Sequence, residues 1–351
     1  MTNGKKTIGI GLVGCGAISE THVKSYLDIE GVRLVAVSDV NGAAAEKMAG
    51  KYGCLFHADY REMIDRDPID AVDICTPSGL RRDIAQYAVE RKKQVIAEKP
   101  IEVTTQRIDE MLEAAQRNGV RIHGIFNTRY KDIYLWLRSF LEAGGLGDLV
   151  FCDIAMKWYR PPEYYRGSWR GTWALDGGGA LMNQCIHFVD LMQLFMGRPS
   201  SVCGSIGRLV HKGLEAEDTA AAILKYPNGA MGIIQASTAL NPGFSTRFCV
   251  HGQKGGIIIE DDVVKDMKVA GLSPEDEKRA EPFRKPTVVN RESAMTNVVS
   301  DYELHRRQLT EIVDAIRENR ESQVSGREAR KAVEIITGIY RSARERREIE
   351  L

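Results

Sequence analysis

The sequence predicts an α/β fold in two parts: an N-terminal doubly wound parallel sheet, then an α+β domain with a large, mostly antiparallel sheet. Three observations support this prediction. The chain has 351 residues, which is enough for two domains. Its first 126 residues alternate short apolar runs with helical patterns, as βαβ units do. Later β-rich segments mostly follow one another without helices between them. We therefore place the two domains at residues 1–126 and 127–351.

The N-terminal part contains five strand-like apolar runs separated by helical patterns. The runs are Ile8–Val13, Leu34–Ser38, Ala71–Cys75, Gln94–Ala97 and Arg121–Phe126. The helical patterns span residues 17–29, 42–52, 80–92 and 104–118. Asn118-Gly119 ends the last of these helices in the usual way. The alternation predicts parallel strands with helical crossovers.

The C-terminal part is predicted to be rich in strands. The β-rich segments are residues 149–158, 202–211, 218–226, 230–239, 245–251 and 256–260. Tyr226-Pro-Asn-Gly229 is a good hairpin turn, which favours antiparallel pairing. Helices are expected at 130–143, 179–196, 301–319 and 326–346, and the charged stretch Ser273–Pro286 is expected to be a mobile loop.

The composition excludes several classes of function. Lys+Arg and Asp+Glu number 48 each, so no net positive charge is available to hold nucleic acid or an anionic membrane. No apolar run approaches the roughly 18 residues of a membrane span. The seven cysteines are scattered and form no CxxC pair, which favours a reducing, cytoplasmic location and argues against a metal site.

A glycine-rich loop follows the first predicted strand and opens the first predicted helix. Such a loop lets the backbone approach a pyrophosphate, which then lies at the helix N-terminus. Asp39 ends the next strand, where a carboxylate binds ribose hydroxyls and repels a 2′-phosphate. This favours NAD over NADP as the cofactor, although Ser19 replaces the third glycine and a purely structural turn is the alternative. The candidate cofactor ligands in the loop are Gly14, Cys15, Gly16, Ala17 and Ile18.

Two further loops follow buried strands and are expected to complete the cofactor site. Thr76-Pro77-Ser78 follows the run at 71–75, and Glu98-Lys99-Pro100 follows the run at 94–97. Open α/β sheets bind ligands at the carboxyl ends of their strands, so Thr76, Pro77, Glu98 and Lys99 are candidates. A surface lysine in a Glu–Lys pair is the alternative interpretation of Lys99.

Polar side chains in the second half form a candidate substrate site. Asn183, His187 and Asp190 lie at i, i+4 and i+7 on an otherwise apolar helix, and buried polar groups need partners or a function. Aromatic rings with arginines suit a polyhydroxylated or acidic sugar, because the rings stack on C–H faces while donors bind hydroxyls. Ordinary core packing is the alternative for both features. The substrate candidates before the helix are Tyr159, Arg160, Trp169 and Arg170.

Four segments together resemble the Gfo/Idh/MocA oxidoreductases, the family of glucose–fructose oxidoreductase and inositol dehydrogenase. They are GCGAIS, TPS, EKP and GGGALMNQCIHFVD, in the family's order and spacing. The resemblance implies a Rossmann domain, an active-site Lys99 before a cis proline, an active-site pair at Asn183 and His187, and Asn127 near the nicotinamide. It also implies a homodimer or homotetramer formed through the open sheet face. The sequence departs from the family's common residues at Asn183 (Asp), Arg81 (His) and Cys185 (Gly).

These residues predict hydride transfer between NAD and a secondary alcohol or ketone of a sugar, sugar derivative or inositol. His187 titrates in the range suited to a base, and a charged Lys99 would stabilise the developing alkoxide; the reverse assignment stays open. Asn183 would orient substrate hydroxyls. Two alternatives remain, an NAD-dependent glycoside hydrolase with transient redox and a non-catalytic NAD- or sugar-binding regulator.

Overall fold

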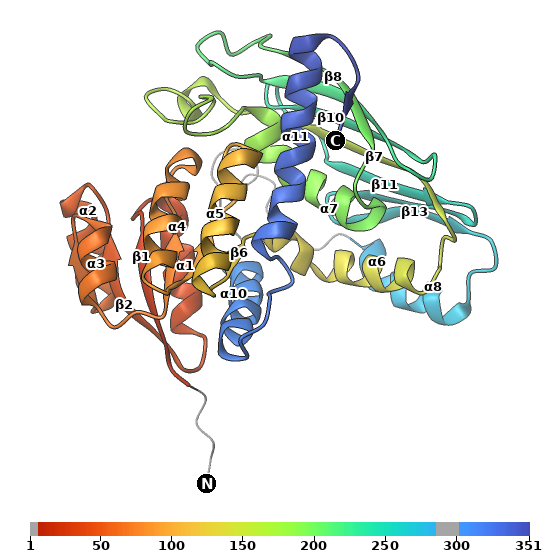
Figure 1. Cartoon of the computed structure of the whole chain (residues 1–351). Coiled ribbons are helices and arrows are strands. Elements are labelled where there is room, and N and C mark those ends of the chain that lie inside the picture. Colours follow the sequence, from red (N-terminus) through yellow and green to blue (C-terminus); the bar gives the residue numbers. More distant parts are fainter. Residues whose placement is uncertain (1–5, 286–301) are drawn as a thin grey trace. The chain divides into compact units, whose positions relative to one another are not determined.

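The computed structural model describes residues 6–285 and 302–351, and these residues form two compact units (Figure 1). Unit 1 comprises Met1–Asn127 and Ser300–Arg330, and unit 2 comprises Thr128–Val299 and Lys331–Leu351. The units differ from the predicted domains 1–126 and 127–351 mainly in residues 300–330. That segment joins unit 1 because Leu309, Ile312 and Val313 are buried in the same apolar core as the first strand.

Unit 1 is built on a six-stranded parallel sheet in the order β3-β2-β1-β4-β5-β6. This confirms the predicted doubly wound sheet. The chain leaves β1 toward β2 on one side and returns to β4 on the other, so a switch point lies between β1 and β4. The strands are β1 (Ile8–Val13), β2 (Val32–Ser38), β3 (Leu55–His57), β4 (Ala71–Ile74), β5 (Gln94–Ala97) and β6 (Ile122–Gly124).

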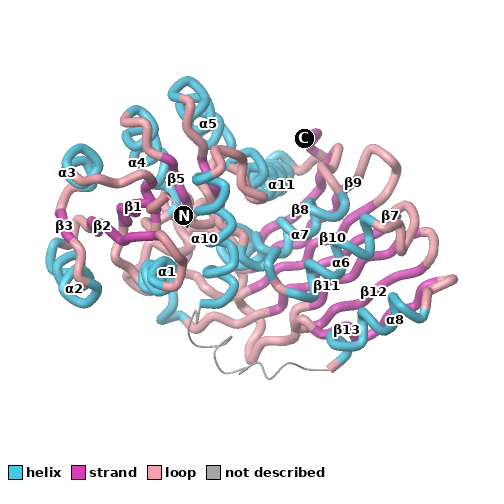
Figure 2. Tube along the Cα trace, turned by 90° about the horizontal axis from the view of Figure 1, so that it is seen from below, coloured by secondary structure: helices cyan, strands magenta, loops and turns pink. Residues whose placement is uncertain are grey.

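Helices cover both faces of this sheet, as Figure 2 shows. Helices α1 and α2 lie on one face with α10, and α3, α4 and α5 lie on the other. All six residues of β1 are buried, as expected for a parallel strand covered on both sides. The helices are α1 (Ala17–Leu27), α2 (Gly42–Tyr52), α3 (Tyr60–Arg66), α4 (Arg81–Glu90), α5 (Thr105–Asn118) and α10 (Tyr302–Arg317).

The sequence prediction missed β3 and α3. Strand β3 has three residues at the sheet edge, and its Leu55 and Phe56 are exposed, so no buried apolar run marks it. Helix α3 has seven residues and begins after Asp59, whose carboxylate accepts a hydrogen bond from the Arg61 N–H. Both elements are too short for periodicity to show.

Unit 2 is built on an eight-stranded sheet in the order β13-β12-β11-β7-β10-β9-β8-β14. Every neighbouring pair is antiparallel except β7 and β10, which confirms a mostly antiparallel sheet. The predicted turn Tyr226–Gly229 joins β9 to β10. The strands are β7 (Leu149–Lys157), β8 (Ser201–Gly207), β9 (Thr219–Lys225), β10 (Met231–Ser237), β11 (Arg247–Gly252), β12 (Gly255–Glu260), β13 (Val263–Val269) and β14 (Ile349–Glu350).

Burial alternates along β7 and β9, so one face of this sheet packs on the core. Helices α6, α7 and α8 lie over one face (Figure 2). A π-helix, Ala180–Cys185, runs directly into α7, although a single α-helix was expected at 179–196. The helices are α6 (Asp132–Glu142), α7 (Ile186–Met196), α8 (Pro274–Ala280) and α11 (Gly326–Glu345), the last of which crosses the unit boundary.

The expectation of a mobile loop at Ser273–Pro286 is wrong for its described part. Residues Pro274–Ala280 form α8, and Glu281–Arg284 form a 3₁₀ turn. Ser273 accepts a hydrogen bond from the Asp276 N–H, and Pro274 occupies the first helical turn, so local capping outweighs the high charge. Pro286 lies outside the described residues. Among the described residues, no helix has the length and apolar character needed to span a bilayer.

Candidate active site

The glycine loop after β1 brings the backbone of two strands close together. Gly14 has φ +97°, and a Cβ there would lie 2.9 Å from the backbone of Cys75 and Thr76. Its N–H donates to the Ser38 carbonyl at 2.8 Å. Gly16 then caps α1, whose first N–H groups point toward the loop. Only glycine fits at position 14, and the resulting turn suits close approach of a pyrophosphate.

Asp39 is held at the end of β2 by the loop that it faces. Its carboxylate accepts the Cys15 N–H at 2.7 Å and the Asn41 N–H at 2.8 Å, through different oxygens. Each carboxylate oxygen can accept a second hydrogen bond, so the group retains capacity for ribose hydroxyls. The structure therefore brings Asp39 to the glycine loop, as the sequence motif predicts.

Lys99 follows β5 at a sharply fixed corner. The Lys99–Pro100 peptide is cis, as the resemblance implied. Arg81 is buried and donates to the carbonyls of Glu98 and Pro100, and also to the Thr76 carbonyl at 2.8 Å. This guanidinium therefore ties the loop after β4 to the loop after β5, which brings the candidates Thr76, Pro77, Glu98 and Lys99 to one edge of the sheet.

Asn127 lies beyond β6 at the same edge and is fixed by α10. Its amide N–H donates to Nδ1 of His305 at 3.1 Å. The neighbouring Gln308 accepts the Phe126 N–H and donates to the Gly124 carbonyl. Gln308 thus satisfies backbone groups at the end of β6, and His305 orients the Asn127 amide.

In unit 2, Asn183 and His187 lie on either side of the junction between the π-helix and α7. Asn183 donates an amide N–H to Asp176 at 2.6 Å, which fixes the plane of the amide. Asp190 receives two hydrogen bonds from Arg129, each 2.6 Å long, in a buried pair. π-Helical turns are frequent at functional sites, because they displace side chains from regular α-helical spacing.

Glu217 anchors the start of the π-helix. Its buried carboxylate accepts the N–H groups of Gly179 and Leu181, at 2.9 and 2.8 Å, and the Tyr340 hydroxyl at 2.9 Å. Burial raises the pKa of Glu217 to about 7. A Cβ at position 179 would collide with the Glu217 carbonyl, so the Gly177–Gly179 run permits this close approach.

The loop after β7 gathers arginines around an aromatic ring. The guanidinium of Arg160 lies 5.4 Å from the centre of the Tyr164 ring, and that of Arg170 lies 4.6 Å from it. Arg170 also lies 5.3 Å from the Trp169 ring. Gln184 of the π-helix donates to the Tyr164 hydroxyl at 3.2 Å, which connects this cluster to the helix that carries Asn183. Tyr159 pairs with Ala239 in an isolated bridge beside the cluster.

The structure therefore gathers the predicted residues into two sets. All cofactor candidates lie at one sheet edge of unit 1, with Lys99 among them. The substrate candidates Tyr159, Arg160, Trp169, Arg170, Asn183 and His187 lie in unit 2.

Sequence reasoning missed several polar side chains that form hydrogen bonds to the predicted site residues or to the segments that carry them. Some had a visible signal: Asp73 is a charge inside a buried strand, and Arg81 departs from the family pattern. Others had none, because their partners lie far away in the sequence. The missed residues are His22, Asp73, Arg81, Tyr164, Glu217 and His305.

Comparison with known families agrees with both units. The model of an oxidoreductase family with an NAD-binding Rossmann fold, Gfo/Idh/MocA, matches residues 8–126. The model of the same family's C-terminal alpha/beta domain matches residues 138–351. The chain belongs to the Gfo/Idh/MocA oxidoreductase family. Its N-terminal sheet is thus an NAD-binding Rossmann domain, which confirms the predicted cofactor.

Members of this family resemble the chain over most of its length. Inositol 2-dehydrogenase from Rhizobium meliloti is 26% identical over 98% of this chain and 99% of its own. Myo-inositol 2-dehydrogenase from Thermotoga maritima is 27% identical over 72% of this chain and 75% of its own. The WlbA dehydrogenase from Bordetella pertussis, solved with NADH and UDP-GlcNAcA, is 28% identical with a TM-score of 0.87 and covers 99% of both chains.

Proposed function

We propose that this protein is an NAD-dependent dehydrogenase that oxidises a secondary alcohol of a sugar, sugar derivative or inositol, or reduces the matching ketone. The observation that carries the proposal is the fixed Lys99 corner, set at the sheet edge that also holds Asp39 and the glycine loop. A surface lysine would not need a buried arginine and a buried carboxylate to fix its backbone. The named dehydrogenases among the relatives support this class of reaction.

We assign a separate role in alcohol oxidation to each of three residues. NAD, when bound, accepts the hydride from the substrate carbon. We assign His187 as the base that takes the hydroxyl proton, and Lys99 as the cation that stabilises the developing alkoxide. Asn183, fixed by Asp176, orients a substrate hydroxyl through its carbonyl oxygen. The same residues would serve with the roles of Lys99 and His187 exchanged, and the pH profiles of the two single variants distinguish the assignments.

The arginine–aromatic cluster favours an acidic sugar within this class. Arg160 and Arg170 flank Tyr164, and Trp169 adds a second ring beside Arg170. Aromatic rings stack on the apolar faces of a sugar, while guanidinium groups bind carboxylate or phosphate oxygens in pairs. A uronate or a nucleotide-linked uronate would satisfy both features, and the WlbA relative was solved with UDP-GlcNAcA.

A substrate panel tests the proposed reaction. The purified protein is mixed with NAD⁺ and with inositols, neutral sugars, uronates, UDP-linked uronates or glycosides, and NADH absorbance is followed. We expect NADH to form in a one-to-one ratio with substrate consumed. Glycoside cleavage without accumulation of NADH would instead identify a glycoside hydrolase, and binding without turnover would identify a regulator.

Single variants test the assigned residues. Lys99→Ala and His187→Ala should each lower turnover by about 10²-fold or more while NAD still binds, because neither change touches the glycine loop. Lys24→Ala, at an exposed position on α1, is the matched lysine control and should keep normal turnover. Full activity in both active-site variants would refute the site assignment.

We also propose a cytoplasmic homodimer or homotetramer. All seven cysteines are thiols in the structure, which suits a reducing compartment. Light scattering of the purified protein tests the assembly, and a mass of one chain would refute it.

A further inference from the structure

Four buried ionisable side chains lie in a continuous row within unit 1, next to Lys99. His22 of α1 contacts Asp73 of β4 through Nδ1 at 2.7 Å, and contacts Glu98 through Nε2 at 3.0 Å. His305 of α10 contacts the same Glu98 oxygen at 3.4 Å. The other Glu98 oxygen accepts the backbone N–H of Lys99 at 2.9 Å. The row therefore runs from the helix after the glycine loop to the backbone of the proposed active-site lysine.

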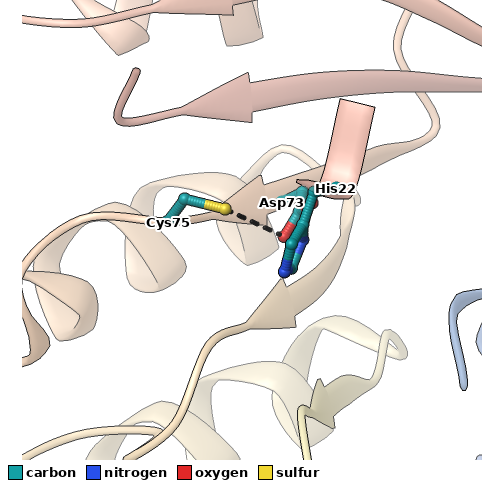
Figure 3. Close-up of side chains that lie close together, drawn as sticks. All are labelled: His22, Asp73 and Cys75. Carbon is teal, nitrogen blue, oxygen red and sulfur yellow. Dashed lines mark hydrogen bonds and ion pairs between the residues drawn. The ribbon is translucent and has the colours of Figure 1, made fainter. Parts of the chain in front are cut away.

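Asp73 has hydrogen-bond partners at both of its carboxylate oxygens. Besides His22, its carboxylate accepts the Tyr26 hydroxyl at 2.9 Å and the Cys75 thiol at 3.9 Å. Figure 3 shows the Cys75 side chain pointing toward Asp73 from one side, with His22 beside the carboxylate. Asp73 and His22 both have no solvent exposure. The hydrogen-bond partners of Asp73 therefore come from α1 and from Cys75, directly after β4.

The geometry also favours the protonated form of His22. A neutral imidazole carries one N–H, so it would place a lone pair against one of the two carboxylates. Both contacts have hydrogen-bond length, and both are donations only when His22 is an imidazolium. Burial alone disfavours the cation, but the Asp73 carboxylate outweighs burial and raises the pKa of His22 well above its ordinary value.

Glu98 completes the row as an anion. Burial disfavours its charge, but donation from His22 and His305 holds the pKa of the Glu98 carboxyl well below its ordinary value. His305 accepts the Asn127 amide N–H at Nδ1, so its Nε2 carries the hydrogen that faces Glu98. The Arg81 guanidinium donates to the Glu98 carbonyl from a separate direction.

We propose that His22 is a positioning residue for catalysis: the Asp73–His22 pair orients the Glu98 carboxylate, which in turn fixes the backbone from which Lys99 projects. The inference rests on the proposed catalytic role of Lys99. His22 touches neither substrate nor cofactor in this scheme. Loss of the imidazolium frees Glu98 to turn, and the Lys99 ammonium then samples directions other than the productive one.

The test compares Asp73→Asn and His22→Gln with His123→Gln. His123 is an equally buried histidine of β6 that contacts Ser322, so it controls for the loss of a buried imidazole. We expect both row variants to lower kcat at least tenfold while the Kd for NAD⁺ changes less than threefold. His123→Gln should lose thermal stability but keep its kcat per folded molecule. Row variants whose kcat equals that of the control would overturn the proposal.

A proton NMR measurement gives a readout independent of activity. The His22 imidazolium, held between two carboxylates, should give a strongly downfield N–H resonance that persists at alkaline pH and disappears in His22→Gln. Absence of this resonance from the wild-type protein would refute the imidazolium. If Lys99→Ala is inactive while Asp73→Asn is fully active, the positioning role fails and the proposed function stands. If Lys99→Ala is itself active, the catalytic role of Lys99 fails, and the positioning proposal that rests on it fails with it.

A bound cation is the competing explanation of the same cluster. Ligand atoms of His22, Glu98 and His305 all lie within 4.8 Å of one another. If the positioning proposal is right, elemental analysis of the purified protein should find no stoichiometric zinc or other transition metal. EDTA should then leave kcat unchanged. One equivalent of metal per chain, lost together with activity, would overturn the positioning proposal.

Discussion

The backbone at Lys99 is held by the side chains of Arg81 and Glu98. Arg81 donates to the carbonyls on both sides of this lysine, and the Glu98 carboxylate accepts the Lys99 N–H. The corner therefore does not depend on a regular element to keep its direction. A catalytic group placed in this way loses little entropy when substrate binds, which is the advantage of preorganisation.

Asp39 is expected to decide between the two nicotinamide cofactors. In Asp39→Asn the amide oxygen still accepts one backbone N–H, but the charge that repels a 2′-phosphate is gone. We expect the KM for NAD to rise about tenfold, because a hydrogen bond to a charged group is lost, and the preference for NAD over NADP to narrow. Steady-state kinetics with both cofactors measure this. An unchanged preference would show that Asp39 does not face the ribose.

Gly14 and Gly50 form a matched pair for testing the turn. Alanine at Gly14 must adopt φ +97° and places a methyl group 2.9 Å from the Thr76 backbone. We expect a loss of about 1–3 kcal/mol in the free energy of unfolding, together with weaker NAD binding. Alanine at Gly50, inside α2 and facing open space, should stabilise the protein by about 0.5–1 kcal/mol. Thermal unfolding and NAD titration measure both, and equal effects at the two positions would contradict this account.

At the scale of elements, the π-helix is the clearest case of tertiary control. Local helix propensity alone predicts a regular α-helix at Ala180–Cys185. Instead, Glu217 binds the N–H groups of Gly179 and Leu181, and Asp176 binds Asn183. These bonds hold the wider turn and set where Asn183 lies relative to the start of α7.

Glu217 should make stability depend on pH. Its pKa is raised by burial from 4.5 to about 7, so the folded protein binds the proton more tightly than the unfolded chain. The stabilisation is complete below pH 4.5 and is lost as the pH rises to about 7, a loss of about 3 kcal/mol in the free energy of unfolding.

Glu217→Gln removes this dependence. The variant should be less stable than wild type at low pH, because its amide N–H faces a backbone donor, and the difference should shrink as the pH rises. Urea denaturation between pH 4.5 and 8 measures the gap. Exposed Glu215→Gln is the control and should keep the wild-type pH dependence. A constant gap between Glu217→Gln and wild type would show that Glu217 does not titrate in this range.

At the scale of the whole molecule, helix α10, from the last fifty residues of the chain, completes the N-terminal sheet. Its Leu309, Ile312 and Val313 pack in one core with Ile8, and its Gln308 satisfies the backbone of β6. The first 127 residues therefore do not contain the whole of their own core. The core of unit 1 therefore includes a segment that follows most of unit 2 in the sequence.

Ile312→Ala tests this dependence. The side chain is fully buried, so its truncation should cost about 2–5 kcal/mol through lost burial and a residual cavity. Hydrogen exchange should accelerate in β1, some 300 residues earlier in the sequence. Leu135→Ala, at an exposed position on α6, is the control and should change stability by less than about 0.5 kcal/mol. Unaltered exchange in β1 would mean that α10 does not stabilise the sheet.

The sequence by itself determined the two kinds of sheet, the glycine loop with Asp39, and the loops that carry Thr76 and Lys99. These features have local signals: alternating apolar periodicity, turn residues, and motifs that follow a strand directly. The sequence prediction missed the edge strands β3, β13 and β14 and the short helix α3.

Only the tertiary structure decided which buried polar side chains meet. His22 and Asp73 are separated by 51 residues, and His22 and Glu98 by 76, so no local pattern pairs them. The same holds for Glu217 at the π-helix and for α10 in unit 1. A buried charge must find a partner wherever the fold brings one within hydrogen-bond distance, and that distance is set by packing across the whole chain.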